Sequence, residues 1–149
     1  MLSTLRPSQN IAVIATIAPA SQAIGPVSSG WISFNAFEAM MGLVQNGALG
    51  VAATIDAIFQ QALDGIGTGA KPVVATGMVQ NVVATDNGKV NIINLLERDL
   101  DVANGFQFVQ LTVTVGVAAS FAGALVLGVN ERYGPAARNN AVFVKQVVN

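Results

Sequence analysis

The feature that most limits the possible folds is the stretch from Val102 to Asn130, which contains no charged residue. Within it, residues 111–129 are apolar enough for a membrane-spanning helix. Residues 106–115 instead alternate between two faces, with Gln107, Val109, Leu111, Val113 and Val115 on one, and Phe106, Phe108, Gln110, Thr112 and Thr114 on the other. This period of two, with many β-branched residues, predicts a β-strand. A membrane-embedded protein of the holin type is the less favoured alternative.

Short strand-like segments separated by turn residues recur along the rest of the chain. Strands are expected at residues 11–18, 31–34, 51–62, 89–96, 121–129 and 141–148, whereas residues 38–44 fit a strand or a short helix. Asn46-Gly47 is the strongest hairpin signal, and Asp86-Asn87-Gly88 and Asn104-Gly105 predict further turns. The pattern predicts an all-β fold, a single-domain β-sandwich or jelly-roll-like barrel with extended terminal arms.

The expected organisation is one domain with three parts. Residues 1–27 form an N-terminal arm or first strand, residues 28–136 form the sandwich core, and residues 137–149 form a C-terminal strand or arm. The N-terminus imitates a signal peptide, because Arg6 precedes the apolar run 11–18 and a small-residue site. That run also alternates, so we expect a strand or an arm that packs on a neighbour.

Composition excludes several classes of function. The chain has neither Cys nor His, so disulfides, thiolate metal sites and Ser-His-Asp or Cys-His mechanisms are impossible. The net charge is −1, and the basic residues are scattered, so nucleic-acid binding is disfavoured. We therefore expect a protein that is not an enzyme and that uses no cofactor.

Two loops imitate ligand sites. The segment Gly65–Lys71 resembles a phosphate-binding loop, but Ala70 and Pro72 depart from that motif. Asp99, Asp101 and Asn104 place oxygen ligands close together, as a calcium loop does, yet Asn104 falls at the sixth position, where that loop needs glycine. They are minor candidates for a divalent ion, and turn capping is the favoured interpretation.

Two further groups have structural interpretations. In an extended strand Glu97, Asp99 and Asp101 share one face, which suits an edge that repels unwanted strand addition. Trp31, the only tryptophan, is expected to anchor the core.

The low charge predicts a large contact surface. Only 10% of residues are charged and 52% are hydrophobic, against about 25% charged in typical soluble domains. Lipid or protein must cover part of such a surface. The terminal segments are the expected contact regions, with six interface candidates: Ile11, Val13, Ile17, Val142, Phe143 and Val144.

The order of six segments resembles a family of small structural proteins from the head modules of tailed bacteriophages. They are residues 30–38 (GWISFNAFE), 47–56 (GALGVAATID), 60–71 (QQALDGIGTGAK), 99–106 (DLDVANGF), 113–116 (VTVG) and 128–135 (GVNERYGP). The resemblance covers roughly residues 28–136 and rests on turn and strand residues.

The resemblance implies a virion component made in the host cytoplasm. Its implied role is a capsid decoration (cement) protein, bound as a homotrimer to the major capsid protein on the outside of the shell. A connector, tail or fibre role within the same gene neighbourhood is the alternative. The resemblance supplies no catalytic residue.

Overall fold

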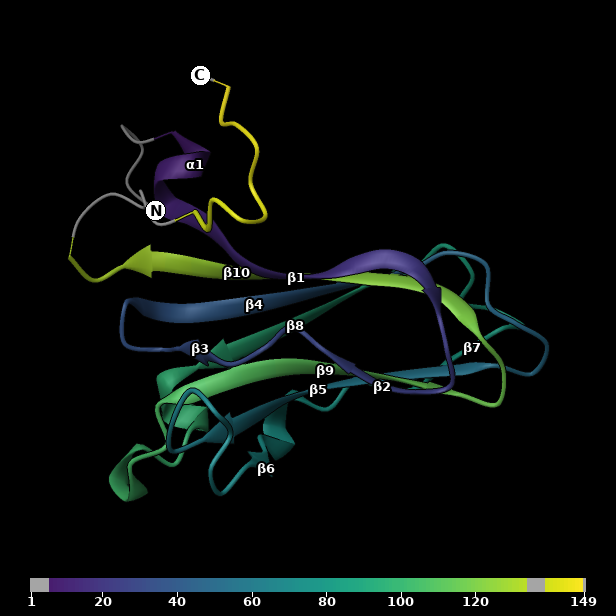
Figure 1. Cartoon of the computed structure of the whole chain (residues 1–149), viewed down its shortest axis with the longest axis horizontal. Helices are drawn as coiled ribbons and strands as arrows, with labels where there is room; N and C mark the ends of the chain where they lie inside the picture. The colour runs from purple at the N-terminus through teal and green to yellow at the C-terminus, as the bar shows by residue number, and fades with distance from the viewer. Residues whose placement is uncertain (1–5, 134–138, 149) are drawn as a thin grey trace.

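The structure is a computed structural model, and it describes residues 6–133 and 139–148. Two antiparallel sheets pack face to face (Figure 1). We call the sheet with strand order β1-β10-β4-β8 sheet A, and the sheet with order β2-β9-β5-β6 sheet B. In sheet B, β3 also pairs with β9 and β7 with β5. The predicted all-β, jelly-roll-like two-sheet sandwich is confirmed.

The elements have the following bounds: α1 (Pro7–Asn10), β1 (Ile11–Gln22), β2 (Gly25–Ser28), β3 (Ile32–Ser33), β4 (Phe37–Asn46), β5 (Thr54–Ala62), β6 (Lys71–Pro72), η1 (Val74–Thr76), β7 (Asn81–Val82), β8 (Val90–Leu96), η2 (Glu97–Asp99), η3 (Val102–Asn104), β9 (Phe108–Gly116) and β10 (Ser120–Glu131). Residues 111–129, which have the hydropathy of a spanning helix, thus form most of β9 and β10. Among the described residues, no helix is both long and apolar enough to cross a membrane.

The core lies between the two sheets and follows from the alternation of the strands. In β9 the predicted alternation is confirmed, and the side with Val109, Leu111, Val113 and Val115 is the inward one, because these residues are at most 1% exposed. Facing side chains from sheet A include Met40, Val44, Leu95 and Val126, and β5 adds Ile55 and Phe59. Side chains of a strand alternate between its two faces, so this burial pattern defines the outward face of each strand.

Two glycines leave room for aromatic rings, Gly42 for a ring of the facing sheet and Gly128 for a ring of its own sheet. A Cβ atom at Gly42 of β4 would lie 3.2 Å from the ring of Phe59, and one at Gly128 of β10 would lie 2.5 Å from the ring of Phe37. Aromatic rings therefore fill the space above these glycines, which explains two glycines inside strands that otherwise disfavour them.

The N-terminal region belongs to the sandwich. β1 pairs with β10 along Ile11–Gln22, and Ala12, Ile14 and Ala15 lie in the core. Of the two expectations for residues 1–27, residues 11–22 form the strand, and the core begins before residue 28. Two irregularities in the β1–β10 register place both Ile14 and Ala15 in the core.

Three local expectations were wrong. Asn46-Gly47 does not close a hairpin, because β4 and β5 belong to different sheets; the Asn46 N–H instead donates to the carbonyl of Lys89 (3.0 Å) and the Gly47 N–H to that of Phe121 (2.7 Å). Glu97–Asp99 forms the 3₁₀-helix η2 rather than an extended edge. The described residues 139–148 contain a turn at 141–143 and no strand.

Candidate assembly surface

Apart from Glu38 and Glu131 at one end, the outward side of sheet A is mostly apolar and carries no charged residue. We define the apolar face as the outward positions of its four strands: Ile11, Val13 and Thr16 of β1; Phe121, Gly123, Leu125, Leu127 and Val129 of β10; Ala39, Met41, Leu43 and Gln45 of β4; and Val90, Ile92, Asn94 and Leu96 of β8. Among its large apolar side chains, Phe121 (55%), Leu125 (40%), Val90 (52%) and Ile92 (62%) are the exposed ones. The register places Leu125, Leu43 and Ile92 in one row across three strands.

The outward side of sheet B is polar by contrast. Gln110 of β9 donates to Gln60 of β5 (2.8 Å), and these residues are cross-strand partners. Asp56 accepts a hydrogen bond from Gln80 (2.6 Å), and Thr114 lies exposed beside it in the register. The outer side of sheet B is therefore polar, whereas that of sheet A is mostly apolar.

Most sheet edges are protected against further pairing. Residues 71–82 run along β5, where Val73 N–H donates to Phe59 (2.8 Å) and Met78 N–H to Ala57 (3.1 Å). β2 is only four residues long and contains Pro26. β1 contains Pro19 and the two register irregularities. Short strands, prolines, bulges and covering segments are the usual devices that prevent edge-to-edge association.

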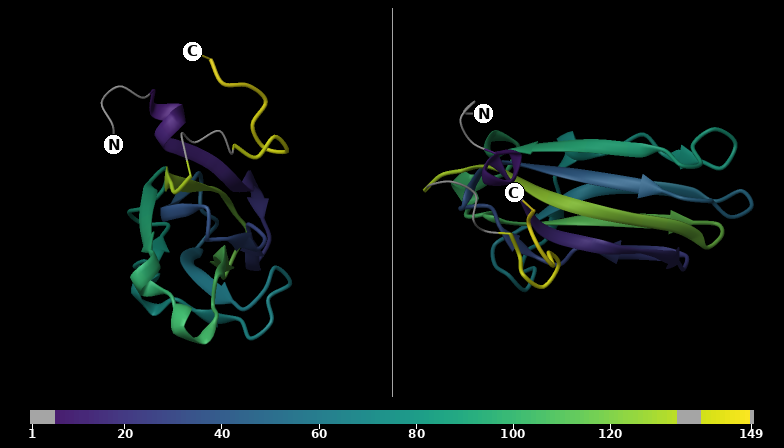
Figure 2. Two further views of the ribbon diagram at one scale, coloured as in Figure 1. Left: turned by 90° about the vertical axis from the view of Figure 1, so that its left-hand side faces the viewer. Right: turned by 90° about the horizontal axis from the view of Figure 1, so that it is seen from above.

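β8 is the exception. It lies at the rim of sheet A (Figure 2, right), and its sequence VNIINLL has neither proline nor charge. Its register with β4 is continuous from Val90 to Leu96. Among the described residues, the Leu96 N–H donates a hydrogen bond to the Asp99 side chain (2.9 Å). No other backbone group of β8 in this part of the chain forms a hydrogen bond to a residue outside β4. β8 is therefore an open edge next to the apolar face.

The C-terminal segment is fixed to the opposite edge of the same sheet. The Val13 N–H donates to the Asn139 side chain (2.8 Å), the Asn140 N–H donates to the carbonyl of Val13 (2.8 Å), and the Asn140 amide donates to Ile14 (3.3 Å). Beyond Asn140 the chain is exposed (Figure 1).

The six interface candidates lie in different environments. Val142 is 82% exposed and Phe143 43%, and Val144 is half-buried. Ile11 and Val13 are half-buried on the apolar face. Ile17 is 4% exposed and belongs to the core, so it offers no contact surface, and its place among the candidates was wrong. The bulge in β1 changes which residues point inward, and alternation alone could not reveal it.

The minor metal candidates are used in local contacts. Asp101 forms an ion pair with Lys71 (2.5 Å) and accepts a hydrogen bond from Asn104 (2.8 Å). Asp99 caps η2 through the Leu96 N–H instead of turning toward Asp101. In the part of the chain that the structure describes, no group of three or more acidic, His or Cys side chains is arranged to hold a metal ion.

The Asp101 contacts predict a pH dependence of stability. Hydrogen bonds from Lys71 and then Asn104 hold the pKa of Asp101 below its ordinary value in the folded chain. A lowered folded pKa stabilises the fold above the unfolded pKa, near pH 4, and this contribution is lost as the pH falls through the folded value. We expect Asp101→Asn to unfold at lower urea concentration than the unsubstituted chain at pH 6, with the difference shrinking below about pH 4. A difference that is constant from pH 6 to pH 2 would contradict the assignment.

The glycine-rich loop packs against an aromatic cluster. Gly67 has a φ of +90°, and a Cβ there would lie 2.6 Å from Nε1 of Trp31. The Lys71 ammonium lies 4.0 Å from the centroid of the Phe106 ring, a cation–π geometry. Trp31 is half-buried beneath this loop rather than fully inside the core as expected. The lysine that a phosphate loop would turn toward its ligand is thus occupied by Asp101 and Phe106.

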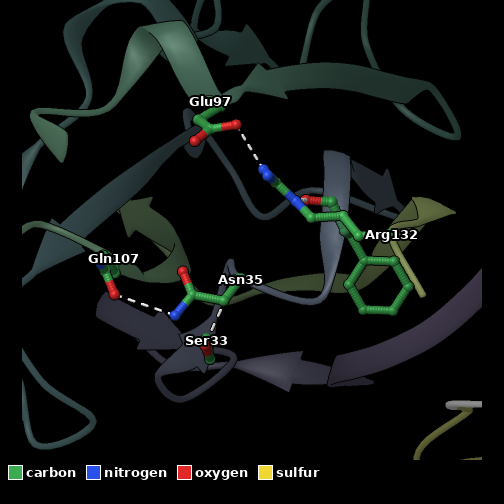
Figure 3. Close-up of polar contacts among 6 residues, drawn as sticks. Ser33, Asn35, Glu97, Gln107 and Arg132 are labelled. Atoms are coloured by element: carbon green, nitrogen blue, oxygen red, sulfur yellow. Dashed lines mark hydrogen bonds and ion pairs between the residues drawn. The ribbon is translucent and has the colours of Figure 1, made fainter.

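A small cleft of about 300 Å³ opens at the end of the sandwich near Arg132. Arg132 forms an ion pair with Glu97 (2.5 Å) and donates from Nε to the carbonyl of Phe37 (2.9 Å). Figure 3 shows these contacts together with a second one, in which the Asn35 side-chain amide donates to the Gln107 side-chain oxygen (3.0 Å). These contacts connect η2, β10 and the β3–β4 turn, and they serve to hold the loops together.

Sequence reasoning missed the apolar face. In β4 and β10 both alternate sets of side chains are apolar, as in the neighbours Met40 and Met41. A strand that is apolar on both sides is a signal of burial on both sides, and that signal was present in the sequence.

No protein-family description matches the sequence, and no curated protein matches it. Solved structures are similar at the level of the fold. One is a chain of the T13 particle of infectious bursal disease virus, with a TM-score of 0.46 and 14% identity over 93% of this chain and 36% of that chain. Another comes from Triatoma virus, with a TM-score of 0.46 and 7% identity over 92% of this chain and 72% of that chain.

A third similar structure is TmCBM61 in complex with β-1,4-galactotriose, with a TM-score of 0.36 and 14% identity over 72% of this chain and 62% of that chain. The chain spans about a third of the chain from the infectious bursal disease virus particle. These likenesses concern the fold alone.

Proposed function

We propose that the chain is a virion structural protein, specifically a decoration (cement) protein that binds as a homotrimer to the outside of a tailed-phage head. Its partner in this proposal is the major capsid protein. The observation that carries the proposal is the apolar face of sheet A, whose defining positions include no charged residue; Glu38 and Glu131 lie at the end of the sheet. The phage assignment rests on the sequence resemblance of residues 28–136.

The physical argument concerns what covers this face. Monomeric soluble proteins seldom expose large continuous apolar patches, and such patches mark contact sites. Burial of apolar area contributes about 25 cal/mol per Å². A standard interface covers about 800 Å² per partner, although association costs offset much of the gain.

A lattice amplifies contacts of this kind. Many identical subunits on one shell make a weak contact effective, because binding of one part of an oligomer raises the local concentration of the others. A chain without catalytic His or Cys and without disulfides fits a role that depends on packing and strand pairing alone. No enzymatic activity and no cofactor are part of the proposal.

The test combines solution mass with binding to shells. We expect light scattering without detergent to give three times the chain mass of 15.3 kDa, and co-sedimentation with purified phage heads to saturate at many copies distributed over the shell. A monomer that stays in the supernatant would overturn the proposal. Few copies at a single vertex would instead assign the chain to the connector or tail.

A further inference from the structure

We propose that residues 141–148 of one copy form a β-strand on the open edge of β8 in the next copy, so that each subunit donates a strand to its neighbour. The inference deepens the proposed function, since it names the contact that joins the subunits. It rests on two features, a strand-forming segment and a strand edge, that find no pairing partner within a single copy of the described chain.

The first feature is a strand-forming sequence without a strand. Residues 141–148 read AVFVKQVV and are rich in β-branched residues. Their described backbone contacts are local, with the N–H groups of Phe143 and Val144 donating to the carbonyl of Asn140 (2.9 and 3.0 Å). Val142 and Val148 are 82% and 81% exposed. A single copy therefore leaves this apolar segment in water.

The second feature is the open edge of β8. Its seven residues carry none of the devices that protect β1, β2 and β5. An exposed, regular, uncharged edge is a template for another strand, and addition of a peptide strand to such an edge is a common mode of recognition. The eight residues 141–148 match its length.

The geometry favours a neighbour over the same chain. Asn139 and Asn140 hold the start of the segment on β1, and β10 and β4 lie between β1 and β8. Strands lie about 4.8 Å apart, so crossing to its own β8 would take the segment over about 14 Å, or roughly four extended residues. Four residues would remain, too few to cover β8. If β8 of a neighbouring copy lies alongside β1, residues 141–148 can pair with it over their whole length.

Strand donation of this kind also sets the symmetry. The donated strand begins beside Val13 of its own β1, where Asn139 and Asn140 are held, and pairs with β8 of the next subunit. Donor and acceptor surfaces differ, which makes the contact heterologous, and heterologous contacts close into rings when the rotation permits. A ring of three has the symmetry of the proposed trimer. One face of the donated strand carries Val142, Val144, Gln146 and Val148, so three of its four side chains are apolar like the face it adjoins.

Engineered cysteines test the contact directly, because the natural chain has no Cys and every disulfide formed is an introduced one. We would mix a protein carrying Asn94→Cys in β8 with proteins carrying Val142→Cys, Val144→Cys or Gln146→Cys, and oxidise them. At least one mixture is expected to give a cross-linked dimer containing both chains. Asp56→Cys, on the outward side of sheet B, is the matched acceptor control and should give none.

Truncation after Asn140 gives an independent measurement. We expect the truncated protein to keep its fold, because the removed side chains are mostly exposed in a single copy, and to dissociate at a concentration at least about tenfold higher. A truncated protein that keeps the full oligomer mass, with no cross-link from Asn94→Cys, would overturn strand donation while leaving the proposed function intact. A full-length monomer that ignores phage heads would overturn the proposed function itself.

Discussion

The double substitution Leu125→Lys and Ile92→Lys is expected to abolish binding to phage heads, with a loss of at least about 1,000-fold in affinity. The two residues occupy one row of the apolar face, with Leu43 between them. A partner that covers this row would have to bury two unpaired ammonium groups, each at a penalty of several kcal/mol. Lysines can keep their charge in water on the free protein, so the fold itself should remain.

The measurement is co-sedimentation with heads, together with a thermal melt of each variant. The matched control is Thr114→Lys with Val79→Lys, two exposed positions outside the apolar face that add the same charge. We expect the control to bind like the unsubstituted chain. Equal loss of binding in both pairs would mean that net charge rather than the apolar face controls the association.

Phe59→Ala is expected to have the largest effect on stability, lowering the free energy of unfolding by about 3–5 kcal/mol. The ring is 0% exposed in the middle of β5, and it lies against Gly42 of the facing sheet. Because Gly42 has no side chain that could move into the space, the cavity would persist. A loss of this size is a large part of the roughly 5–15 kcal/mol available to a domain.

Urea unfolding measures this loss, with Phe121→Ala as the control. Phe121 is the same residue type but is 55% exposed on the apolar face, so its truncation should change the free energy of unfolding by less than about 1 kcal/mol. Similar losses for the two variants would mean that the ring of Phe59 does not anchor the core.

The strands that could be predicted are those whose two faces differ. In β9 the alternation of Leu111 and Val113 with Thr112 and Thr114 predicted the strand and its division into two faces. β8 has apolar residues on both sides, and its position between two turns placed its ends within a residue. A period of two is a local property of the sequence, so it can be recognised without knowing which elements the strand packs against.

Pairing was harder to predict, because it depends on distant segments. Asn46-Gly47 has the composition of a hairpin turn, yet Asn46 bonds to Lys89 and Gly47 to Phe121, and the chain passes between sheets. Residues 141–148 have strand propensity but no strand partner among the described residues. Propensity for a strand expresses the fit to a neighbour, and the sequence does not say which neighbour is present.

The candidate surface was predicted only in outline. The shortage of charge indicated a large contact, and the terminal residues Val142 and Phe143 are exposed as a contact requires. The apolar face was missed, because Met41 and Leu43 were not separated from inward Met40 and Val44 by any change in polarity. The bulge that buries Ile17 likewise has no mark in the sequence pattern.

The uncharged character of the apolar face determines how its association responds to the environment. Contacts between charged groups weaken as ions screen them, with a Debye length of about 8 Å at physiological ionic strength, but a face without charges offers nothing to screen. Apolar association instead weakens on cooling, since its driving force near room temperature is entropic. A particle held together in this way would tolerate dilute and concentrated brines alike, and cold would be the condition that loosens it.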